Sequence, residues 1–329
     1  MRLSIVIPVY NVAPYLERCV QSVMRQTFKD SEVILVDSDK CTDDSNEMCA
    51  RYAAENPTFR VIRQEEPGLA GARNTGIRHA RGEFIIFLDG DDYWMLDDGL
   101  ERLFDAVSDD TDLVVFKSVD VWDQERVVTV RDFDLERIEA LPDAPAVFDY
   151  LVRAQEFSMS ACVNLVRREL LTGNDIFFPV GYTSEDVFWS IHLWQHIRKC
   201  RILNLDMYGY CHRAGSLSTV PSIWIYESYD RIFTFWKEPC GHDCVNAAPI
   251  RIYLADMWVS RGYGYYQQKK KDKPMALAVL KRHADLLRYA GTPKARRAAF
   301  LVRYFGVKRA AVLLGVYWRL RSVVKRHVK

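Results

Sequence analysis

The chain lacks any long uninterrupted apolar segment. In its 329 residues no hydrophobic run reaches the roughly 18 residues that a membrane-spanning helix needs. Internal repeats and low-complexity stretches are also missing, which excludes solenoid and fibrous proteins. Because an apolar strand pattern begins at Leu3, we expect no secretory signal peptide ahead of it. The eight cysteines are scattered, and without such a signal we interpret them as reduced thiols.

Acidic residues are missing from the end of the chain. No Asp or Glu follows Asp285, whereas 11 Lys or Arg lie between Lys294 and Lys329. The formal net charge is only +1, so the rest of the chain is acidic. Aromatic and aliphatic residues such as Trp318 mix with these basic residues, which is typical of a helix lying on an anionic membrane surface. The alternative is a terminal helix with its apolar side on the protein and its basic side in water. We expect no nucleic-acid binding, since no recognition module is visible.

Apolar residues make up 49% of the chain, and the length suits an α/β domain of roughly 200–250 residues with an appended piece. Strand and helix patterns alternate at the N-terminal end, which predicts βαβ units and a largely parallel sheet. The expected strands are 3–9, 32–37, 59–62, 83–89, 113–121, 202–205 and 208–212, with a hairpin arm at 126–130, a loop at 132–145 and a helix at 184–195. From residue 221 onward the pattern is helical, with breaks at Gly262, Gly264 and the charged segment 269–273. We therefore predict an α/β domain over 1–220 and a helical extension over 221–329.

The segment from Phe84 to Asp92 is the most informative one. A short apolar strand ends there in three carboxylates, Asp89, Asp91 and Asp92, around one glycine. The C-terminal ends of strands in open α/β sheets form the edge where ligands bind. Clustered carboxylates repel one another unless a cation lies between them, and oxygen ligands suit Mg²⁺ or Mn²⁺ together with substrate phosphates. The segment predicts a metal–diphosphate site, and a solvated acidic turn is the alternative.

Polar residues also follow the other predicted strands. Tyr10 is suited to stacking on a nucleotide base, and Asp37 and Asp39 to accepting hydrogen bonds from a base or ribose. The glycine-containing segment 68–74 leads into a helix, where backbone N–H groups and Arg73 favour an anion. Each feature alone has an ordinary structural explanation. Together, at successive strand ends, they predict a site for a nucleoside diphosphate.

Two weaker motifs lie further along the chain. Glu185 and Asp186 open a predicted helix, either as partners of the helix dipole or as a general base that deprotonates an acceptor hydroxyl. His212 and Arg213 lie at the end of a predicted strand. His212 is suited to binding a metal and Arg213 to pairing with a phosphate, and the alternative is that both are structural. The segment 240–244 holds two cysteines and a histidine with no second ligand pair nearby, so we do not expect zinc there.

Four segments of the chain form one ordered signature, namely Ser4–Asn11 (SIVIPVYN), Gln26–Phe28 (QTF), Gly68–Gly76 (GLAGARNTG) and Phe87–Asp92 (FLDGDD). With them the chain resembles a known family, the inverting family 2 glycosyltransferases of the GT-A (nucleotide-diphospho-sugar transferase) fold. The resemblance is strong over about residues 3–120 and thinner through 184–186 and 210–218. It implies a mostly parallel sheet flanked by helices, with a helical C-terminal extension.

The resemblance implies a set of site residues. Those implied to contact the nucleotide sugar are Pro8, Val9, Tyr10, Asp37, Asp39, Arg73, Asn74, Asp89, Gly90 and Arg213. Those implied to hold Mg²⁺ or Mn²⁺ are Asp91, Asp89 and His212. Asp186, with Glu185 beside it, is implied to be the catalytic base.

One segment departs from the family pattern. Members usually show Val-Asp-Asp-Gly-Ser-Thr-Asp after the second strand, whereas this chain has VDSDKCTD from Val36 to Asp43. Aligned from the right, Asp39 takes the base-contacting place, and aligned from the left, Ser38 takes it. The missing glycine also changes the turn, so base selectivity is the implied property that this departure affects.

The resemblance implies a metal-dependent, inverting transfer from a nucleotide sugar, UDP-linked by expectation, to a hydroxyl of a glycan or lipid-linked acceptor in surface polysaccharide synthesis. The enzyme would be cytoplasmic and peripheral on the inner face of the plasma membrane. Two alternatives stay open. A sugar-phosphate nucleotidyltransferase normally has a glycine- and lysine-rich N-terminal loop, which residues 8–11 do not provide. A non-catalytic nucleotide-sugar-binding subunit would lack the metal acid or the base, yet Asp91 and Asp186 are both present.

Overall fold

The computed structural model describes residues 1–122, 126–129, 131–212, 222–237 and 246–327. The chain divides into two compact units. Unit 1 comprises residues 1–146, 158–181 and 185–216, and unit 2 comprises 147–157, 182–184 and 217–329. Three sequence-based predictions lie outside the described residues, namely Arg213, the segment 240–244 and the domain boundary near residue 220.

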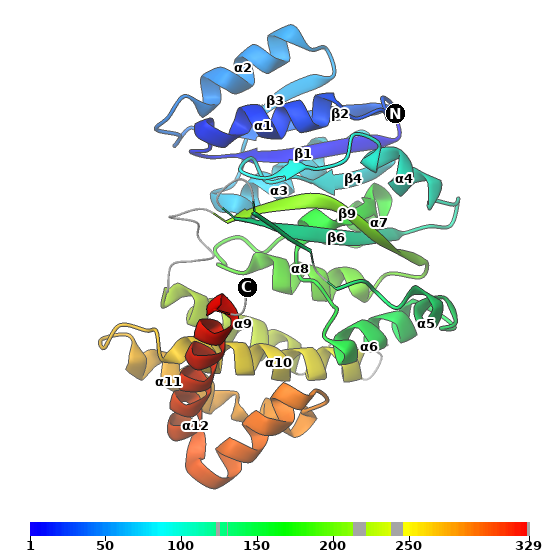
Figure 1. Ribbon diagram of the computed structural model, residues 1–329. Helices are drawn as coiled ribbons and strands as arrows, with labels where there is room; N and C mark the ends of the chain where they lie inside the picture. The colour runs from blue at the N-terminus through cyan, green and yellow to red at the C-terminus, as the bar shows by residue number, and fades with distance from the viewer. Residues whose placement is uncertain (123–125, 130, 213–221, 238–245, 328–329) are drawn as a thin grey trace. The chain divides into compact units, whose positions relative to one another are not determined.

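Unit 1 is built on one mixed sheet (Figure 1). Within the described residues its nine strands follow the order β3-β2-β1-β4-β8-β6-β9-β5, with β7 paired to β6. Strands β3, β2, β1 and β4 are parallel, as expected, whereas β8 runs antiparallel to both β4 and β6. The bounds are β1 Leu3–Val9, β2 Ser31–Asp37, β3 Phe59–Arg63, β4 Phe84–Phe87, β5 Tyr93–Trp94, β6 Leu113–Trp122, β7 Arg126–Thr129, β8 Asn164–Arg167 and β9 Cys200–His212.

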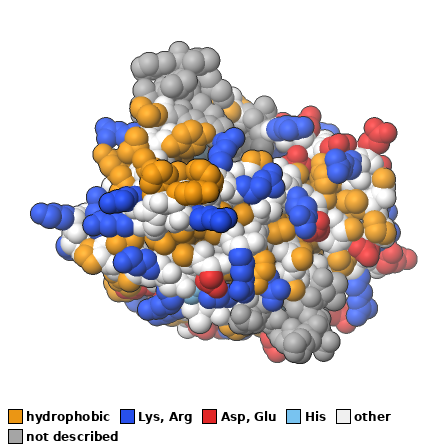
Figure 2. All heavy atoms as spheres, turned by 90° about the horizontal axis from the view of Figure 1, so that it is seen from below, with side chains coloured by type: hydrophobic (Ala, Val, Ile, Leu, Met, Phe, Trp, Pro, Cys, Tyr) orange, Lys and Arg blue, Asp and Glu red, His pale blue; other side chains and the backbone are white. Residues whose placement is uncertain are grey.

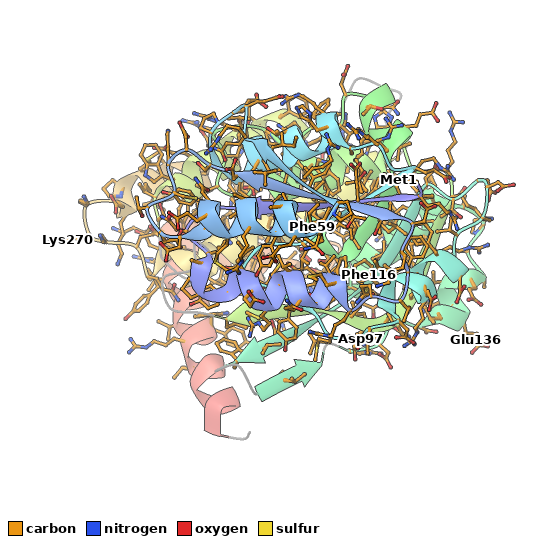
Figure 3. All side chains as sticks on the ribbon, turned by 90° about the horizontal axis from the view of Figure 1, so that it is seen from above. Met1, Phe59, Asp97, Phe116, Glu136 and Lys270 are labelled. Atoms are coloured by element: carbon orange, nitrogen blue, oxygen red, sulfur yellow. The ribbon has the colours of Figure 1, made fainter. Side chains whose placement is uncertain are left out.

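Helices cover both faces of this sheet. The strand order reverses after β3, because β4 pairs with β1, and right-handed crossovers then place α3 on the face opposite α1 and α2. Figures 1 and 3 show α1 and α2 side by side, with α3 across the sheet from them. The bounds are α1 Ala13–Met24, α2 Ser45–Glu55, α3 Gly68–His79, α4 Gly99–Asp105, α5 Leu135–Glu139, the 3-10 helix η1 Ala161–Val163, α7 Arg168–Gly173 and α8 Glu185–Trp194.

The first strands lie in the core. Every residue of β1 and of β4 is buried, which explains why these segments are continuous apolar runs rather than alternating ones. Helix α3 packs directly on β1 because Gly76 has no side chain. A Cβ atom at Gly76 would lie 2.2 Å from Cγ1 of Val6. The reversal point between β1 and β4 is the place where open α/β sheets bind ligands.

Strand β9 differs from its prediction. Two short strands were expected, but the chain runs as one strand from residue 200 to 212. The polar residues that interrupt the apolar pattern are satisfied by neighbours instead of by a turn. The Asn204 side chain exchanges two hydrogen bonds with the backbone of Phe133, at 2.7 and 3.0 Å, and Asp206 lies 2.9 Å from Nζ of Lys117.

The predicted loop over 132–145 was also wrong in part. It contains α5, whose first turn is capped by the Asp134 carboxylate accepting from the backbone N–H of Arg137 at 3.2 Å. The hairpin arm predicted nearby is confirmed, since β7 pairs antiparallel with the end of β6.

Unit 2 is helical in its described residues. Its helices are α6 Ala144–Ala154, which begins in unit 1, α9 Trp224–Lys237, α10 Ala247–Tyr265, α11 Lys273–Arg282, the 3-10 helix η3 Ala284–Tyr289 and α12 Pro293–His327. The break expected at Gly262 and Gly264 was wrong, because α10 is continuous through both. A Cβ atom on Gly262 would lie 3.2 Å from Leu314 of α12, so this glycine permits close helix packing. Helix α12 kinks at Gly306, where φ is +71°. None of the described helices is both long and apolar enough to cross a bilayer.

Candidate active site

A buried arginine on α3 joins the ends of two distant elements. Arg73 is 2% exposed, and its Nη2 atom donates to both carboxylate oxygens of Asp89, at 2.9 and 3.2 Å. Its Nη1 atom donates to Glu185 at 3.2 Å and to Asp186. Asp89 follows β4, and Glu185 and Asp186 begin α8. The structure therefore brings together four residues that the sequence assigned to separate parts of the site.

The electrostatics of this cluster follow from burial. Burial by itself lowers the pKa of the Arg73 guanidinium, but the charges of Asp186 and Asp89 outweigh that effect and hold the pKa well above its usual value. Burial, reinforced by the Asp186 charge, raises the pKa of Glu185 to about 7. Burial also raises the pKa of Asp186, while Arg73 opposes the rise. The carboxyl pair is thus a better proton acceptor than an exposed pair.

Asn74 holds the segment that leads towards α8. Its amide nitrogen donates to the Phe178 carbonyl at 2.9 Å, and its amide oxygen accepts from the Phe178 N–H at 2.8 Å. The Phe178 ring stacks on Trp189 of α8 with centroids 4.7 Å apart. At the start of the same helix, Asp186 accepts a separate hydrogen bond from the backbone N–H of Ala161 at 3.4 Å. The contacts of Asn74 are those of a positioning residue, and its predicted contact with the nucleotide stays a prediction.

The acidic turn after β4 concentrates negative charge. Asp92 is buried, and burial and then the charges of Asp89 and Asp91 raise its pKa well above the usual value. Asp92 accepts from the Tyr208 hydroxyl at 2.5 Å and from the Cys211 N–H at 2.7 Å. Asp89 and Asp91 remain half-buried. The three acids therefore split into one buried structural carboxylate, Asp92, and two half-buried ones, of which Asp89 is held by Arg73.

These residues fit a divalent cation of the hard type. Within the described part of the chain, no three His, Cys, Asp or Glu side chains gather into a ready-made metal cage. Mg²⁺, however, usually binds through one or two carboxylates and completes its shell with waters and substrate phosphates. Asp91 and Asp89 offer carboxylate oxygens of that kind. Their negative charges raise the pKa of Asp92, and a bound cation would offset this negative charge.

His212 is occupied elsewhere in this structure. Its Nε2 atom lies 2.7 Å from Oδ1 of Asp120, and its ring stacks on Trp122 at 3.6 Å. The contact of this strand end with the acidic turn is made by the preceding residue, Cys211, whose backbone N–H donates to Asp92. The role of His212 as a metal ligand stays a prediction.

The end of β1 lies against the acidic turn. A Cβ atom on Gly90 would lie 3.1 Å from the Pro8 carbonyl oxygen and 3.0 Å from Val12, so only a small residue fits between the two turns. Val9 ends β1 in the core, and the Tyr10 side chain that follows is 56% exposed. An exposed aromatic ring beside a buried strand end is available for stacking on a planar ligand.

The turn after β2 presents its acids differently. Asp37 is buried and lies 3.1 Å from Arg63, and among the described residues its Oδ1 atom has no hydrogen-bond partner. Burial raises the pKa of Asp37, with Arg63 opposing. Asp39 is exposed, whereas Ser38 is buried with its hydroxyl accepting from the Lys40 N–H at 3.2 Å. The unpaired oxygen of Asp37 is the feature here that a ligand donor would satisfy.

Sequence patterns did not single out three residues that support the acidic turn. Tyr208 and Cys211 bind Asp92 from β9, and Arg18 of α1 donates to the Asp91 carbonyl at 3.3 Å. The Arg18 guanidinium also lies 4.4 Å from the centroid of the Tyr93 ring. The segment 210–218 was recognised around Cys211, but the contacts of Tyr208, Cys211 and Arg18 with the acidic turn depend on the tertiary structure.

The fold is that of a GT-A glycosyltransferase, and the family comparison agrees. The model of the family described as "Glycosyl transferase family 2" matches residues 4–168, half of the chain. The glycosyltransferase GlyG of Streptococcus pneumoniae is 31% identical over 65% of this chain and 72% of its own length. The chain therefore belongs to glycosyltransferase family 2.

Other relatives are longer than the region they share. EpsJ of Bacillus subtilis, an uncharacterized glycosyltransferase, is 32% identical over 67% of this chain and 63% of its own length. GlyA of Streptococcus pneumoniae is 29% identical over 77% of this chain, which spans only 34% of GlyA.

Solved structures confirm the fold at low sequence identity. Staphylococcus aureus TarS 1–349 in complex with UDP-GlcNAc superposes with a TM-score of 0.72 at 21% identity, covering 97% of this chain and 92% of that one. The mannosyltransferase PcManGT from Pyrobaculum calidifontis, in complex with GDP-Man and Mn²⁺, gives 0.57 at 19% identity, covering 96% and 87%.

Proposed function

We propose that this glycosyltransferase moves a sugar from a UDP-linked donor to a hydroxyl of a glycan or lipid-linked acceptor in cell-surface polysaccharide synthesis, with inversion at the anomeric carbon. The observation that carries the proposal is the contact of one buried arginine, Arg73, with both Asp89 and Asp186. It links the acid expected on the donor side to the acid expected on the acceptor side. Solved relatives with UDP-GlcNAc or UDP support a UDP donor.

Asp186 is the proposed catalytic base. Its burial raises its pKa and therefore its affinity for a proton, and Arg73 and Ala161 fix the orientation of its carboxylate. The acceptor hydroxyl gives its proton to Asp186 as its oxygen bonds to the anomeric carbon. The bond from that carbon to the nucleotide diphosphate breaks on the opposite side, which inverts the centre. Glu185, with a pKa of about 7, is proposed to gain or lose a proton near neutral pH and so to change the negative charge next to Asp186.

Asp91 and Asp89 are the proposed ligands of Mg²⁺ or Mn²⁺. A bound divalent cation neutralises charge on the leaving diphosphate. PcManGT and GalNAc-T7 were both solved with Mn²⁺, which supports this type of cation. The remaining task of the chain's own residues is to hold the acidic turn in place, which Arg73 does at Asp89 and Arg18 does at the Asp91 carbonyl.

The nucleotide is proposed to lie along the ends of β1 and β2. Tyr10 offers its exposed ring to the base, Pro8 and Val9 form the wall beneath, and the free oxygen of Asp37 accepts from the base or ribose. Asp39 is the alternative acceptor, since it lies exposed in the same turn. We further propose that residues 1–220 form the catalytic domain and 221–329 an accessory helical extension.

We also propose that α12 contacts an anionic membrane, on the inner face of the plasma membrane. Ala310, Ala311 and Leu314 are buried, and helical spacing places a second apolar stripe opposite them. That stripe is exposed and consists of Val312, Leu313, Val316 and Leu320. A helix that only packed on its own protein would need one apolar face, not two. Figure 2 shows a face of the molecule where hydrophobic side chains gather with Lys and Arg side chains around them.

Asp186→Asn tests the catalytic proposal. Transfer and donor hydrolysis are measured for wild type and variant, and binding of UDP-sugars in Mn²⁺ is measured by calorimetry. We expect the variant to bind the donor with wild-type affinity and to lose about 10²–10⁴-fold in transfer rate. Glu185→Gln is the matched neighbour and should keep more activity. An inactive wild type that still binds donor would instead favour a nucleotide-sugar-binding subunit.

A further inference from the structure

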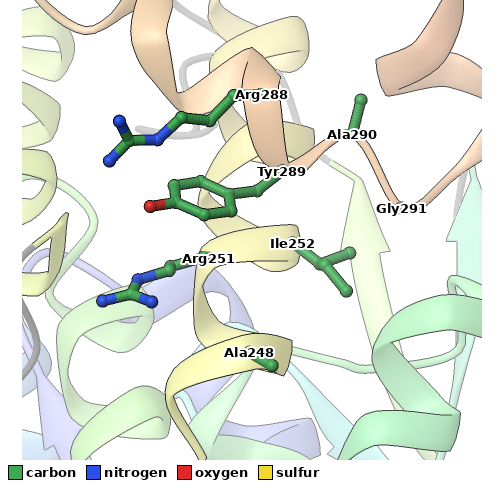
Figure 4. A pocket seen from close by; sticks show the side chains of 7 residues that line it. All are labelled: Ala248, Arg251, Ile252, Arg288, Tyr289, Ala290 and Gly291. Atoms are coloured by element: carbon green, nitrogen blue, oxygen red, sulfur yellow. The ribbon is translucent and has the colours of Figure 1, made fainter. Parts of the chain in front are cut away.

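Unit 2 contains a hollow of about 280 Å³ that the proposed reaction does not use (Figure 4). It lies between the first turns of α10 and the end of η3. Its lining residues are Ala248, Arg251, Ile252, Arg288, Tyr289, Ala290 and Gly291. The hollow thus combines small apolar walls with two cationic side chains.

The two arginines flank one aromatic ring. The guanidinium carbons of Arg251 and Arg288 lie 5.2 and 4.7 Å from the centroid of the Tyr289 ring. In Figure 4 the ring lies between them, and the phenolic hydroxyl points to the same end as both guanidinium groups. Three hydrogen-bond donors therefore converge at one end of the hollow.

These cations lack an anionic partner within the described residues. No ion pair joins either arginine to a carboxylate there, and the buried Nε atom of Arg251 has no hydrogen-bond partner. The acids on the same two elements are already used. Asp256 of α10 lies 3.3 Å from Lys294, and Asp285 of η3 lies 2.7 Å from Lys237.

The wall of the hollow is held in place by its neighbours. A Cβ atom on Gly291 would lie 2.8 Å from Ile252, so the chain after η3 runs directly against α10. The next residue, Thr292, is buried and its hydroxyl donates to Asp256. The Gly291 carbonyl accepts from Arg296 at 3.0 Å. The position of Tyr289, and with it the arginine arrangement, is therefore set before any ligand arrives.

We propose that this hollow binds a phosphate group. Guanidinium groups form paired, charge-assisted hydrogen bonds with phosphate oxygens, and two of them with a hydroxyl supply more donors than a carboxylate accepts. An anion at this point also relieves the repulsion between the two cations. The phosphate belongs either to a soluble phosphorylated compound or to a lipid headgroup, and these sources share the same recognition chemistry.

The test uses the full chain at constant ionic strength. Binding of inorganic phosphate and of glycerol 1-phosphate is measured by calorimetry, and flotation is measured with phosphatidylglycerol and with phosphatidylcholine vesicles. The variants are Arg251→Gln and Arg288→Gln. Arg198→Gln, an exposed residue of unit 1, is the control with the same change of charge. Circular dichroism and UDP binding verify that each variant is folded.

We expect saturable binding by the wild type that falls about ten- to a hundredfold in each hollow variant and is kept in the control. If the wild type binds the soluble phosphates and the hollow variants do not, the ligand is a free phosphate. If only flotation with phosphatidylglycerol vesicles falls in the hollow variants, the ligand is a lipid headgroup. Folded hollow variants that match the wild type with every probe would overturn the proposal, as would a wild type that binds none of them. Donor hydrolysis is measured separately, so a failure of the proposed reaction is distinguishable from a failure of this site.

Discussion

Arg73 and Asp186 are 113 positions apart in the chain, yet the guanidinium of one donates directly to the carboxylate of the other. The same guanidinium holds Asp89. One buried cation thus orders both the turn proposed to face the donor and the residue proposed to activate the acceptor. A change at this arginine should consequently disturb stability and catalysis together.

Arg73→Met is expected to lower the free energy of unfolding by about 3–5 kcal/mol, because it removes the cation that pairs with the buried Glu185 and the half-buried Asp89 and Asp186. Urea unfolding at pH 7 measures the change. Arg78→Met on the same helix is the control. Arg78 also pairs with two acids, Glu65 and Glu66, but its side chain is 38% exposed, so its loss should cost less than about 1 kcal/mol. Equal losses in the two variants would contradict the role assigned to Arg73.

The raised pKa of Glu185 predicts a stability effect of defined sign. Its pKa is about 7 in the folded state against an ordinary value of 4.5, so the folded state holds its proton more tightly than the unfolded state. The stability that Glu185 contributes is complete below pH 4.5 and is lost as the pH rises to about 7. Relative to Glu185→Gln, the wild type should lose free energy of unfolding across that window. Urea unfolding at a series of pH values measures the difference, and a constant difference would refute the assignment.

The neighbouring acids Asp91 and Asp92 should respond in opposite ways. Asp91→Asn is expected to lower Mn²⁺-stimulated transfer by more than about a hundredfold with little change in melting temperature. Asp92→Ala removes the partner of the Tyr208 hydroxyl and the Cys211 N–H and should cost about 1–3 kcal/mol of stability. Mn²⁺ titrations of activity and thermal unfolding separate the two effects. A stable Asp92→Ala protein would show that this carboxylate is not structural.

The exposed stripe of α12 predicts a selective loss of membrane binding. A Val316→Ser and Leu320→Ser double variant should bind phosphatidylglycerol vesicles at least about tenfold more weakly, since both side chains are exposed and would enter the lipid. Its thermal unfolding should match the wild type. Leu314→Ser on the buried face should instead lower stability. Vesicle binding that is equal in the wild type and the double variant would rule out this stripe as the contact.

Much of the first half of the molecule was predictable because its signals are local. Strands β1 and β4 are buried apolar runs, β2 is buried from Glu32 onward, and each is followed by polar residues at the edge of the sheet where ligands bind. The continuous β9 was missed because the residues that satisfy Asn204 and Asp206 lie far away in the sequence. The helix α5 was missed although its Asp134 cap is a local signal.

The sequence by itself determined the family, the parallel start of the sheet and the acidic turn after β4, since hydrophobic periodicity and short motifs depend on neighbouring residues. Only the tertiary structure decided that Arg73 joins Asp89 to Asp186, that Asn74 holds Phe178, and that Asp92 is a buried structural acid. These roles come from contacts across crossovers of the chain, where packing and burial choose the partner. The local sequence pattern therefore does not predict these contacts.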